Sequence, residues 1–292
     1  MNTSTHNKTM MFDEVVTVEV VRHFCHIANR RLGVGLDAKA EALVPGRVAK
    51  RLKQLQLPLD EYLNRLKEDE HCDEVVGFLD LMRSRPQPFF ARWSDFTRLH
   101  SLLRRAMANG RRRFRLWSAG CGSGEEPYGM ALIALDAIDT MGLNPEDVDV
   151  KVLATDLSPR VLQRGKKGLF GEAQIHHVPR DMRHRYFSAM SEGLAIAPAV
   201  KSLVVFRRLN LADLPFPMTG PLDAVFCQEG LAPLLPRARQ RTVEAIKAIL
   251  AKDGLLCAGS EDEIPATLSS EQQAEEFDWE DLLRSVRTPG HC

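Results

Sequence analysis

The sequence predicts an α/β fold in which a doubly wound parallel sheet follows a helical N-terminal region. Apolar residues recur at helical spacing through residues 13–110. From about Arg113, short apolar runs alternate with helical segments, which is typical of parallel β-α-β units. A glycine-rich turn at residues 120–124 joins the first of these strands to the next helix. Doubly wound sheets bind ligands at turns of this kind.

The N-terminal elements follow one another closely. Residues 15–27 and 44–55 predict two helices, a third begins at Pro58, and a fourth covers residues 75–82. Prolines then interrupt the helical pattern at residues 83–88. A further helix over residues 96–107 leads to the first strand. We therefore expect a flexible leader at 1–12, a helical N-terminal domain at 13–92 and a linker helix at 93–112.

The second part of the chain carries the predicted sheet. Strands are expected at residues 113–118, 150–155, 222–227 and 254–259. The helices between them are expected at residues 125–138, 158–167 and 236–251. Leu194, Ile196, Val204 and Phe206 predict a small antiparallel β insertion at about 190–207. This domain is expected to span 113–265, and residues 266–292 form an acidic C-terminal tail.

Bulk composition narrows the function. The chain has 292 residues, with 39 basic and 39 acidic side chains, so no overall charge favours nucleic acid. No apolar run approaches the roughly 18–20 residues of a membrane-spanning helix, and no signal peptide is recognisable at the N-terminus. The six cysteines lack the spacing of a metal site. We expect a cytoplasmic protein with free thiols that binds neither metal nor nucleic acid and does not insert into membranes.

The glycine turn indicates the kind of ligand. Gly120, Gly122 and Gly124 let a ligand approach the backbone, because no Cβ intervenes. Glu125 and Glu126 follow at once, and carboxylates at a helix start would repel a phosphate. They suit hydroxyl groups or a positive charge. S-adenosyl-L-methionine (SAM) and its product S-adenosyl-L-homocysteine (SAH) have a ribose and an ammonium group and no phosphate, so the turn predicts a SAM site.

An ordered series of motifs resembles the chemotaxis receptor methyltransferase (CheR) family over roughly residues 15–262. The segment 118–128 is similar to the family's Ser-Ala-Gly-Cys-x-x-Gly-Glu-Glu-Pro-Tyr, and 154–158 to its second-strand motif. Phe206 with 209–211, and Phe226 with Cys227, are similar to two further motifs. Members of the family transfer a methyl group from SAM to glutamates of chemoreceptors. The resemblance implies a Rossmann-like SAM-dependent methyltransferase domain, SAM as cofactor and a chemoreceptor-like signalling partner.

Three more residues join the expected cofactor site. Asp156 ends the second strand, where a carboxylate can hold the ribose diol, or it can cap the next helix together with Ser158. Asn210 can pair with an adenine edge or simply form a turn. Gln228 follows the fourth strand and completes the set. Of Glu125 and Glu126, one is expected to face the cofactor, although both also complement the helix dipole.

The sequence departs from the family pattern on the methyl-acceptor side. Ala91 stands where the family has an arginine, and Pro233 stands where it has a tyrosine. Arg92 is a possible substitute, but a one-residue shift on a helix turns a side chain by about 100°. An Arg-Asn pair is replaced by Gln228 and Glu229, and a new carboxylate would repel a glutamate acceptor unless an arginine neutralises it. Arg85 and Arg92 are the candidates for that role.

Two functions therefore remain open from the sequence. One is carboxyl methylation of glutamates on a chemoreceptor-like protein. The alternative is a catalytically degenerate relative that binds SAM or SAH, or only a protein partner, and acts as a regulatory or scaffold module. The catalytic residues, the identity of the partner and the oligomeric state stay undetermined. Arginines crowd the start of the first strand, at 104, 105, 111, 112, 113 and 115, as a contact surface or a solvated face.

Overall fold

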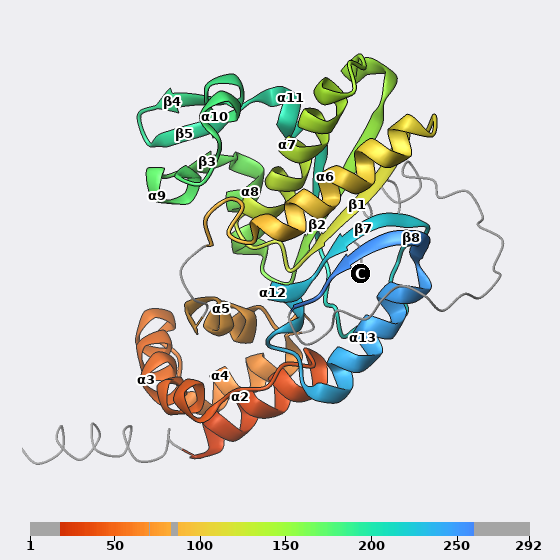
Figure 1. Cartoon of the computed structure of the whole chain (residues 1–292). Coiled ribbons are helices and arrows are strands. Elements are labelled where there is room, and N and C mark those ends of the chain that lie inside the picture. The colour runs from red at the N-terminus through yellow and green to blue at the C-terminus, as the bar shows by residue number, and fades with distance from the viewer. Residues whose placement is uncertain (1–17, 70, 83–86, 260–292) are drawn as a thin grey trace, which may run out of the picture. The chain divides into compact units, whose positions relative to one another are not determined.

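The computed structural model describes residues 18–69, 71–82 and 87–259 (Figure 1). The predicted leader at 1–12 and the tail at 266–292 lie outside these residues. The chain divides into two compact units, one of residues 1–85 with 233–238 and the other of residues 86–232 with 239–292. None of the helices in the described part of the chain is long and apolar enough to cross a membrane.

The described part of the first unit contains the helices α2 (Val18–Arg31), α3 (Ala38–Leu55), α4 (Leu59–Glu68) and α5 (Asp73–Met82). Asp37 caps α3 by accepting a hydrogen bond from the Ala40 N–H at 2.7 Å. Phe24 of α2 packs edge to face against Phe78 of α5, with ring centroids 5.5 Å apart. The helical prediction for this region is confirmed because its apolar faces are buried against one another.

The basic face of α3 is partly neutralised inside the first unit. The Arg51 Nε donates to both carboxylate oxygens of Glu74, at 3.0 and 3.1 Å. The Tyr62 hydroxyl donates to the same carboxylate at 3.3 Å. Lys50 and Lys53 remain exposed. The positive charge on the surface of α3 therefore comes from basic side chains other than Arg51.

The second unit is built on a five-stranded parallel sheet in the order β6-β2-β1-β7-β8. The strands are β1 (Arg113–Ala119), β2 (Asp149–Asp156), β6 (Val204–Arg208), β7 (Leu222–Phe226) and β8 (Leu250–Cys257). Helices α6 (Trp93–Ala108), α7 (Glu125–Thr140) and α8 (Pro159–Lys167) cover one face, and α13 (Pro236–Ala248) lies on the other (Figure 1). The predicted doubly wound α/β fold is confirmed.

The central strand explains why the sheet was recognisable. Phe114, Leu116 and Trp117 of β1 are completely buried. A parallel strand covered by helices on both faces reads as a continuous apolar run. The Trp117 indole N–H still finds a partner, since it donates to the Thr155 hydroxyl of β2 at 2.9 Å.

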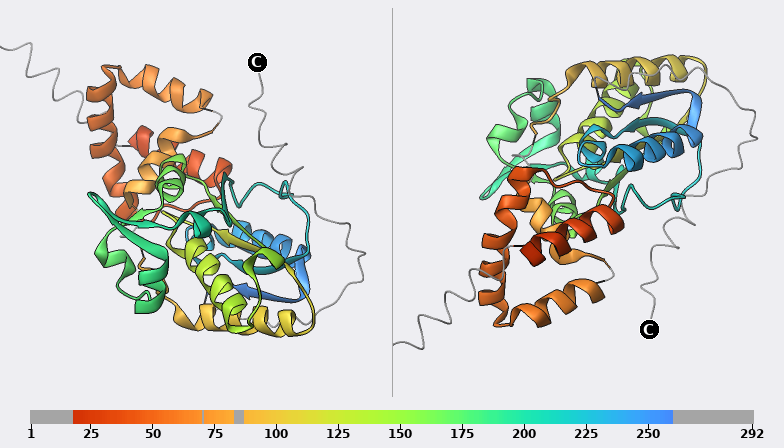
Figure 2. Two further views of the ribbon diagram at one scale, coloured as in Figure 1. Left: turned by 90° about the horizontal axis from the view of Figure 1, so that it is seen from above. Right: turned by 90° about the horizontal axis from the view of Figure 1, so that it is seen from below.

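A second, three-stranded antiparallel sheet has the order β3-β5-β4. Its strands are β3 (Leu169–Phe170), β4 (Phe187–Met190) and β5 (Gly193–Ile196). This small sheet lies away from the edge strand β8 in both views of Figure 2. The prediction of an antiparallel β insertion is confirmed as an element of the fold.

One expected part of the insertion was wrong. Val204 and Phe206 belong to β6, which pairs in parallel with β2 and so extends the main sheet. The Phe206 ring is buried against Tyr128, with centroids 5.6 Å apart. A short apolar strand pattern looks the same whether its neighbour is a hairpin partner or a distant parallel strand, so the pattern alone could not separate the two.

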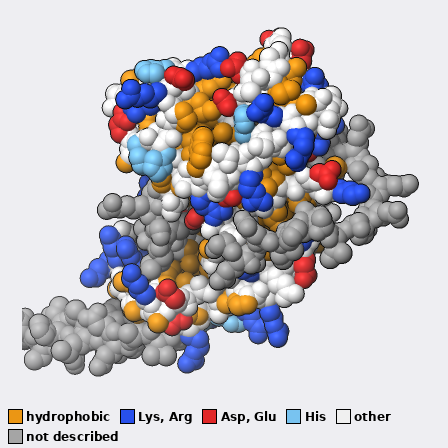
Figure 3. Space-filling view, in the orientation of Figure 1, with side chains coloured by type: hydrophobic (Ala, Val, Ile, Leu, Met, Phe, Trp, Pro, Cys, Tyr) orange, Lys and Arg blue, Asp and Glu red, His pale blue; other side chains and the backbone are white. Residues whose placement is uncertain are grey.

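Shorter helices complete the unit: η1 (Pro145–Asp147), α9 (Glu172–Ile175), α10 (Arg180–Tyr186), α11 (Pro198–Lys201) and α12 (Gln228–Leu231). On the face of the second unit seen in Figure 3, Lys and Arg side chains are interspersed with Asp and Glu side chains. That mixture agrees with the balanced charge of the whole chain.

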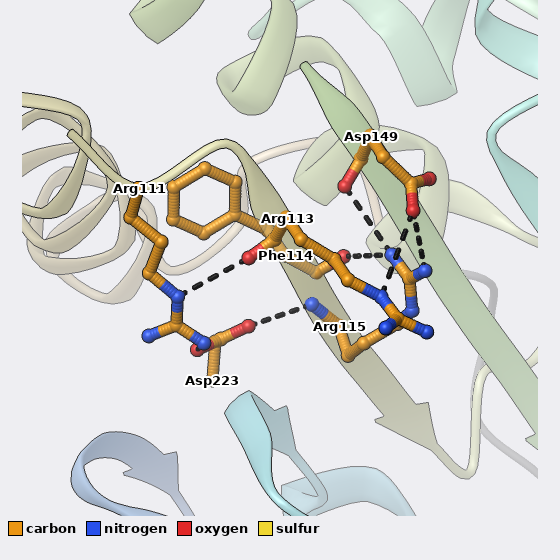
Figure 4. Close-up of polar contacts among 6 residues, drawn as sticks. All are labelled: Arg111, Arg113, Phe114, Arg115, Asp149 and Asp223. Atoms are coloured by element: carbon orange, nitrogen blue, oxygen red, sulfur yellow. Dashed lines mark hydrogen bonds and ion pairs between the residues drawn. The ribbon is translucent and has the colours of Figure 1, made fainter. Parts of the chain in front are cut away.

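The arginines near the start of β1 are held in an ion-pair network (Figure 4). The buried Asp223 carboxylate accepts the Arg115 backbone N–H at 2.7 Å and pairs with the Arg111 guanidinium. The buried Arg115 side chain reaches Asp149 at 2.5 Å. Burial raises the pKa of Asp223, while these donors oppose that rise. Arg111 and Arg115 therefore join β1, β2 and β7 and are not simply a solvated basic face.

Candidate functional site

The predicted cofactor residues lie at the carboxyl ends of β1, β2, β6 and β7. The backbone N–H groups of Gly120 and Cys121 donate to the Thr155 carbonyl at 2.8 and 2.9 Å. The Gly122 N–H donates to the Asp156 carboxylate at 3.1 Å. The turn after β1 is thus attached to the end of β2. A parallel sheet places its ligand site at this edge.

The three glycines of the turn have different surroundings. A Cβ at Gly120 would lie 2.4 Å from the backbone of Gly230, so that glycine permits α12 to pack on the turn. A Cβ at Gly124 would lie 3.2 Å from Gly165 and from the Tyr128 ring. A Cβ at Gly122 would meet nothing within 4 Å, and its φ is +52°. Gly122 alone of the three combines a positive φ with open space, which suits close approach of a ligand.

Asp156 is buried and well supported. One carboxylate oxygen accepts the Gly122 N–H, and the other accepts the Ser158 N–H at 2.9 Å. Ser158 is the residue that caps α8, because its hydroxyl accepts the Val161 N–H at 3.4 Å. A carboxylate oxygen can accept more than one hydrogen bond. The geometry of Asp156 is therefore compatible with a further hydroxyl donor.

The two glutamates after the turn have separate partners. Glu125 accepts the Ser123 hydroxyl at 2.8 and 3.0 Å and also pairs with the Gln174 amide. Burial raises the pKa of Glu125, although these donors oppose the rise. Glu126 accepts the Ser118 hydroxyl at 2.6 Å. Both carboxylates are held by donors that come from the glycine-turn region or from α9.

The pKa of Glu126 lies well above the ordinary value of a glutamate. Desolvation raises its pKa to about 7, and the negative charges of Glu229 and Asp95 add to the rise. The Ser118 hydroxyl and the positive charge of Arg92 oppose it. A carboxyl group that titrates near neutral pH gains from a cationic partner, because the cation favours its ionised form.

Asn210 and Gln228 flank the same region. The Asn210 side-chain oxygen accepts the Ala212 N–H at 3.1 Å, so the turn-forming role is present in the structure. Gln228 is half-buried at the start of α12, and its side-chain oxygen is a buried acceptor without a hydrogen-bond partner among the described residues. A buried acceptor of this kind needs a donor.

The donor and acceptor pattern of these residues fits SAM. Carboxylates and the Gln228 oxygen are acceptors, and SAM offers ribose hydroxyls, an adenine amino group and an ammonium group to them. Gly122 supplies the open backbone. Among the described residues no group of His, Cys, Asp and Glu side chains is arranged to hold a metal ion.

The residues expected near the methyl acceptor are divided between the two units. Ala91 is exposed, and Glu229 is exposed on α12. Pro233 belongs to the first unit, where its carbonyl accepts the Gly35 N–H at 3.1 Å. Arg92 lies immediately before α6, and its Nε and Nη2 donate to the Asp95 carboxylate at 2.9 and 2.6 Å. Arg85 lies outside the described residues.

Sequence reasoning missed several residues of this region. Asp95, Ser118, Gln174 and Cys257 were not assigned to the site. Asp95 carries a local signal, because it follows Arg92 by three residues at a helix start, where opposite charges meet. Cys257 ends β8 and contacts Asp95, far away in the sequence. A contact over that separation leaves no local pattern.

The parallel sheet and the acceptor-rich site at its carboxyl edge define a class, the Rossmann-like SAM-dependent methyltransferases. The model of the CheR methyltransferase SAM-binding domain matches residues 88–279. The chain therefore belongs to the CheR methyltransferase family, and its cofactor is SAM.

Similar proteins agree with this assignment. A chemotaxis protein methyltransferase of Borreliella burgdorferi is 26% identical over 256 residues, which cover 85% of this chain and 89% of the relative. Chemotaxis protein methyltransferase 1 of Pseudomonas aeruginosa is 30% identical, over 80% of this chain and 85% of the relative. A magnesium protoporphyrin IX methyltransferase structure from Synechocystis with bound SAH shares 15% identity over 60% of this chain and 63% of its own. The TM-score of this comparison is 0.29.

Proposed function

We propose that this protein transfers a methyl group from SAM to a glutamate side chain of a chemoreceptor-like signalling protein. The observation that carries the proposal is that the charge of Arg92 acts on Glu126, one of the predicted cofactor-side residues. Arg92 opposes the raised pKa of Glu126, so its charge is felt at the turn after β1. A guanidinium there can bind the carboxylate that receives the methyl group.

The cofactor roles follow from the donor and acceptor pattern. Asp156 accepts the ribose hydroxyls, and Asn210 recognises the adenine edge. Gly120, Gly122 and Gly124 shape the turn that would hold the cofactor, and the open space at Gly122 would allow it to approach the backbone. Gln228 completes its hydrogen bonding with a cofactor donor. These roles are supported by the buried Asp156 carboxylate and the unpartnered Gln228 oxygen.

Between the two glutamates, we assign the cofactor's ammonium group to Glu126. Glu125 is already satisfied by Ser123 and Gln174. Glu126 has one hydrogen-bond donor, Ser118, and a pKa of about 7. An ammonium group beside Glu126 would stabilise the ionised carboxylate.

The chemistry requires alignment more than proton transfer. SAM supplies an electrophilic methyl group on a sulfonium. A glutamate is ionised at neutral pH and is already nucleophilic, so the protein has to desolvate it and hold one oxygen in line with the methyl carbon. Arg92 holds the acceptor carboxylate and offsets the negative charges of Glu229 and Glu126. No general base is needed for an acceptor that carries no proton.

The proposed function is tested by methyl transfer in vitro. The full chain is incubated with methyl-labelled SAM and chemoreceptor cytoplasmic fragments, and SAH binding is measured by calorimetry. We expect base-labile label on the receptor, and we expect Asp156→Ala to abolish both labelling and SAH binding. The exposed α6 variant Arg104→Ala serves as the matched control. One-to-one SAH binding without any labelling would contradict the proposed enzymatic activity and support the alternative, a regulatory module that binds the cofactor.

A further inference from the structure

The segment that carries Arg92 is fixed against the carboxyl edge of the sheet. The Phe90 and Phe96 rings pack edge to face with centroids 4.9 Å apart. Phe96 also packs against Phe226, the last residue of β7, at 5.3 Å. A Cβ at Gly129 in α7 would lie 3.0 Å from the Phe96 ring. Arg92 therefore projects from a rigid support and not from a free loop.

Asp95 holds one edge of the Arg92 guanidinium. Asp95 is 9% exposed, although it is an ionisable residue in the first turn of α6. A single carboxylate oxygen accepts both the Nε and the Nη2 of Arg92, at 2.9 and 2.6 Å. The other oxygen lies 3.8 Å from the Arg98 guanidinium. Asp95 is therefore in closer contact with Arg92 than with Arg98.

Asp95 is itself held from the sheet. Cys257, the last residue of β8, is buried, and its thiol lies close enough to Asp95 for that carboxylate to affect the thiol's pKa. Burial first, and then the negative charge of Asp95, raise the pKa of the Cys257 thiol, which keeps the thiol protonated and able to donate. Asp95 thus links the end of β8 to the arginine.

Asp95 leaves part of the Arg92 guanidinium unbound. A guanidinium has five N–H groups, and the Asp95 carboxylate takes the Nε group and one on Nη2. The outer edge, formed by Nη1 and the second Nη2 N–H, has no partner among the described residues. The Arg92 side chain as a whole is 38% exposed, so it is not enclosed by the described residues. Two parallel N–H groups are the arrangement that binds a carboxylate with both oxygens.

The geometry points to Asp95 as the positioning residue for the methyl acceptor: it clamps the Nε edge of Arg92 so that the outer edge receives the substrate carboxylate. This inference rests on the proposed function. It also explains how Arg92 can act although it stands one residue after Ala91, the position at which the family has its arginine. A side chain displaced along the chain can still serve the same centre if a neighbouring group redirects it, and Asp95 provides that redirection.

A double-mutant cycle on the full chain tests the inference. Arg92→Ala, Asp95→Ala and the double variant are assayed for kcat and KM with a receptor fragment and for SAH binding. We expect each single change to lower kcat/KM about 30-fold, and the double variant to be no worse than Arg92→Ala, because Asp95 acts only through Arg92. Asp95→Glu should restore part of the activity, and SAH affinity should change much less than kcat/KM in all variants, because Arg92 and Asp95 reach the cofactor side only through their charges on Glu126.

Two outcomes would overturn the positioning role. The first is additive losses in the double variant, and the second is a full loss of SAH binding in Asp95→Ala with normal folding, which would place Asp95 on the cofactor. Arg104→Ala, on the exposed side of α6, is the control for nonspecific charge effects.

A second readout does not depend on activity. The Arg92 Nε–H resonance is followed by NMR while an unmethylated receptor fragment is added to the wild-type chain and to Asp95→Asn. We expect the resonance to shift on addition of the fragment in the wild type and to stay unchanged in the variant. If the wild type transfers no methyl group, the proposed function fails, and this titration still decides the geometry. An unshifted wild-type resonance, or equal shifts in both proteins, contradicts the inference.

Discussion

At the scale of single residues, Glu126 shows how the fold alters the chemistry of a side chain. Its carboxyl lies in the first turn of α7 with one hydroxyl donor, Ser118. Desolvation raises its pKa from 4.5 to about 7. A native state that binds a proton more tightly than the unfolded chain loses stability as the pH rises.

The first prediction concerns pH and stability. The contribution of Glu126 is fully present below pH 4.5 and is lost as the pH rises through about 7. The glutamine side chain of Glu126→Gln does not titrate, so the variant shows no such pH-dependent loss of stability. We therefore expect the free energy of unfolding of the wild type to fall relative to the variant by about 1–3 kcal/mol between pH 5 and 8. Urea denaturation of both proteins across this range measures the difference, and parallel pH profiles would contradict the account.

A second prediction separates two glycines of the same turn. Gly120→Ala places a Cβ 2.4 Å from the backbone of Gly230. It should cost more than about 3 kcal/mol, because two backbone segments must move apart. Gly122→Ala has open space around the new methyl group, and its cost is limited to about 1–2 kcal/mol of left-handed strain.

The two variants are compared by thermal unfolding and SAH calorimetry. Gly122→Ala should remain folded and bind SAH more weakly, because the methyl group occupies the open side of the turn. Equal stability losses in the two variants, or unchanged SAH affinity in Gly122→Ala, would show that the assigned surroundings are incorrect.

At the scale of secondary-structure elements, the start of the sheet depends on a buried charge network. Asp223 of β7 accepts the backbone N–H of Arg115 in β1 and pairs with Arg111. Its side chain is 1% exposed. Removal of one partner from a buried ion network leaves the remaining charge without compensation.

The third prediction follows from this network. Asp223→Ala should lower the free energy of unfolding by about 3–5 kcal/mol, because it leaves the buried Arg115 backbone N–H without its acceptor and removes the carboxylate that pairs with Arg111. Arg113→Ala is the matched control: its side chain is 49% exposed and lies 3.8 Å from Asp149, so we expect a loss below about 1 kcal/mol. Chemical denaturation measures both. A small effect of Asp223→Ala would show that the network is dispensable.

The elements also show what a sequence pattern can predict. β1 and β2 were recognisable because strands buried on both faces are continuously apolar. The pairing of β6 with β2 was missed, because Val204 and Phe206 alternate in burial like the strands of a local hairpin. Helix α12 was also missed, since four residues are too few for a helical period to be visible.

At the scale of the whole molecule, the two halves of the candidate site differ in how far the sequence predicts them. Gly122 and Asp156 could be placed together, because both follow strands whose carboxyl ends share one edge of a parallel sheet. The contact between Asp95 and Cys257 joins the first turn of α6 to the end of β8 and has no local signature. The proposed compensation by Arg92 therefore depends on contacts that only the folded chain forms.

We propose that Arg92 takes over the acceptor side of the site and that the protein directs a methyl group to a carboxylate there. The direct measurement is mass spectrometry of receptor fragments after incubation with SAM and either the wild type or Arg92→Ala. The account predicts base-labile methyl esters on glutamates with the wild type, and a yield reduced about 30-fold with the variant, at unchanged SAH affinity. Equal ester yields from the two proteins, or no ester from a wild type that binds SAH, would contradict it.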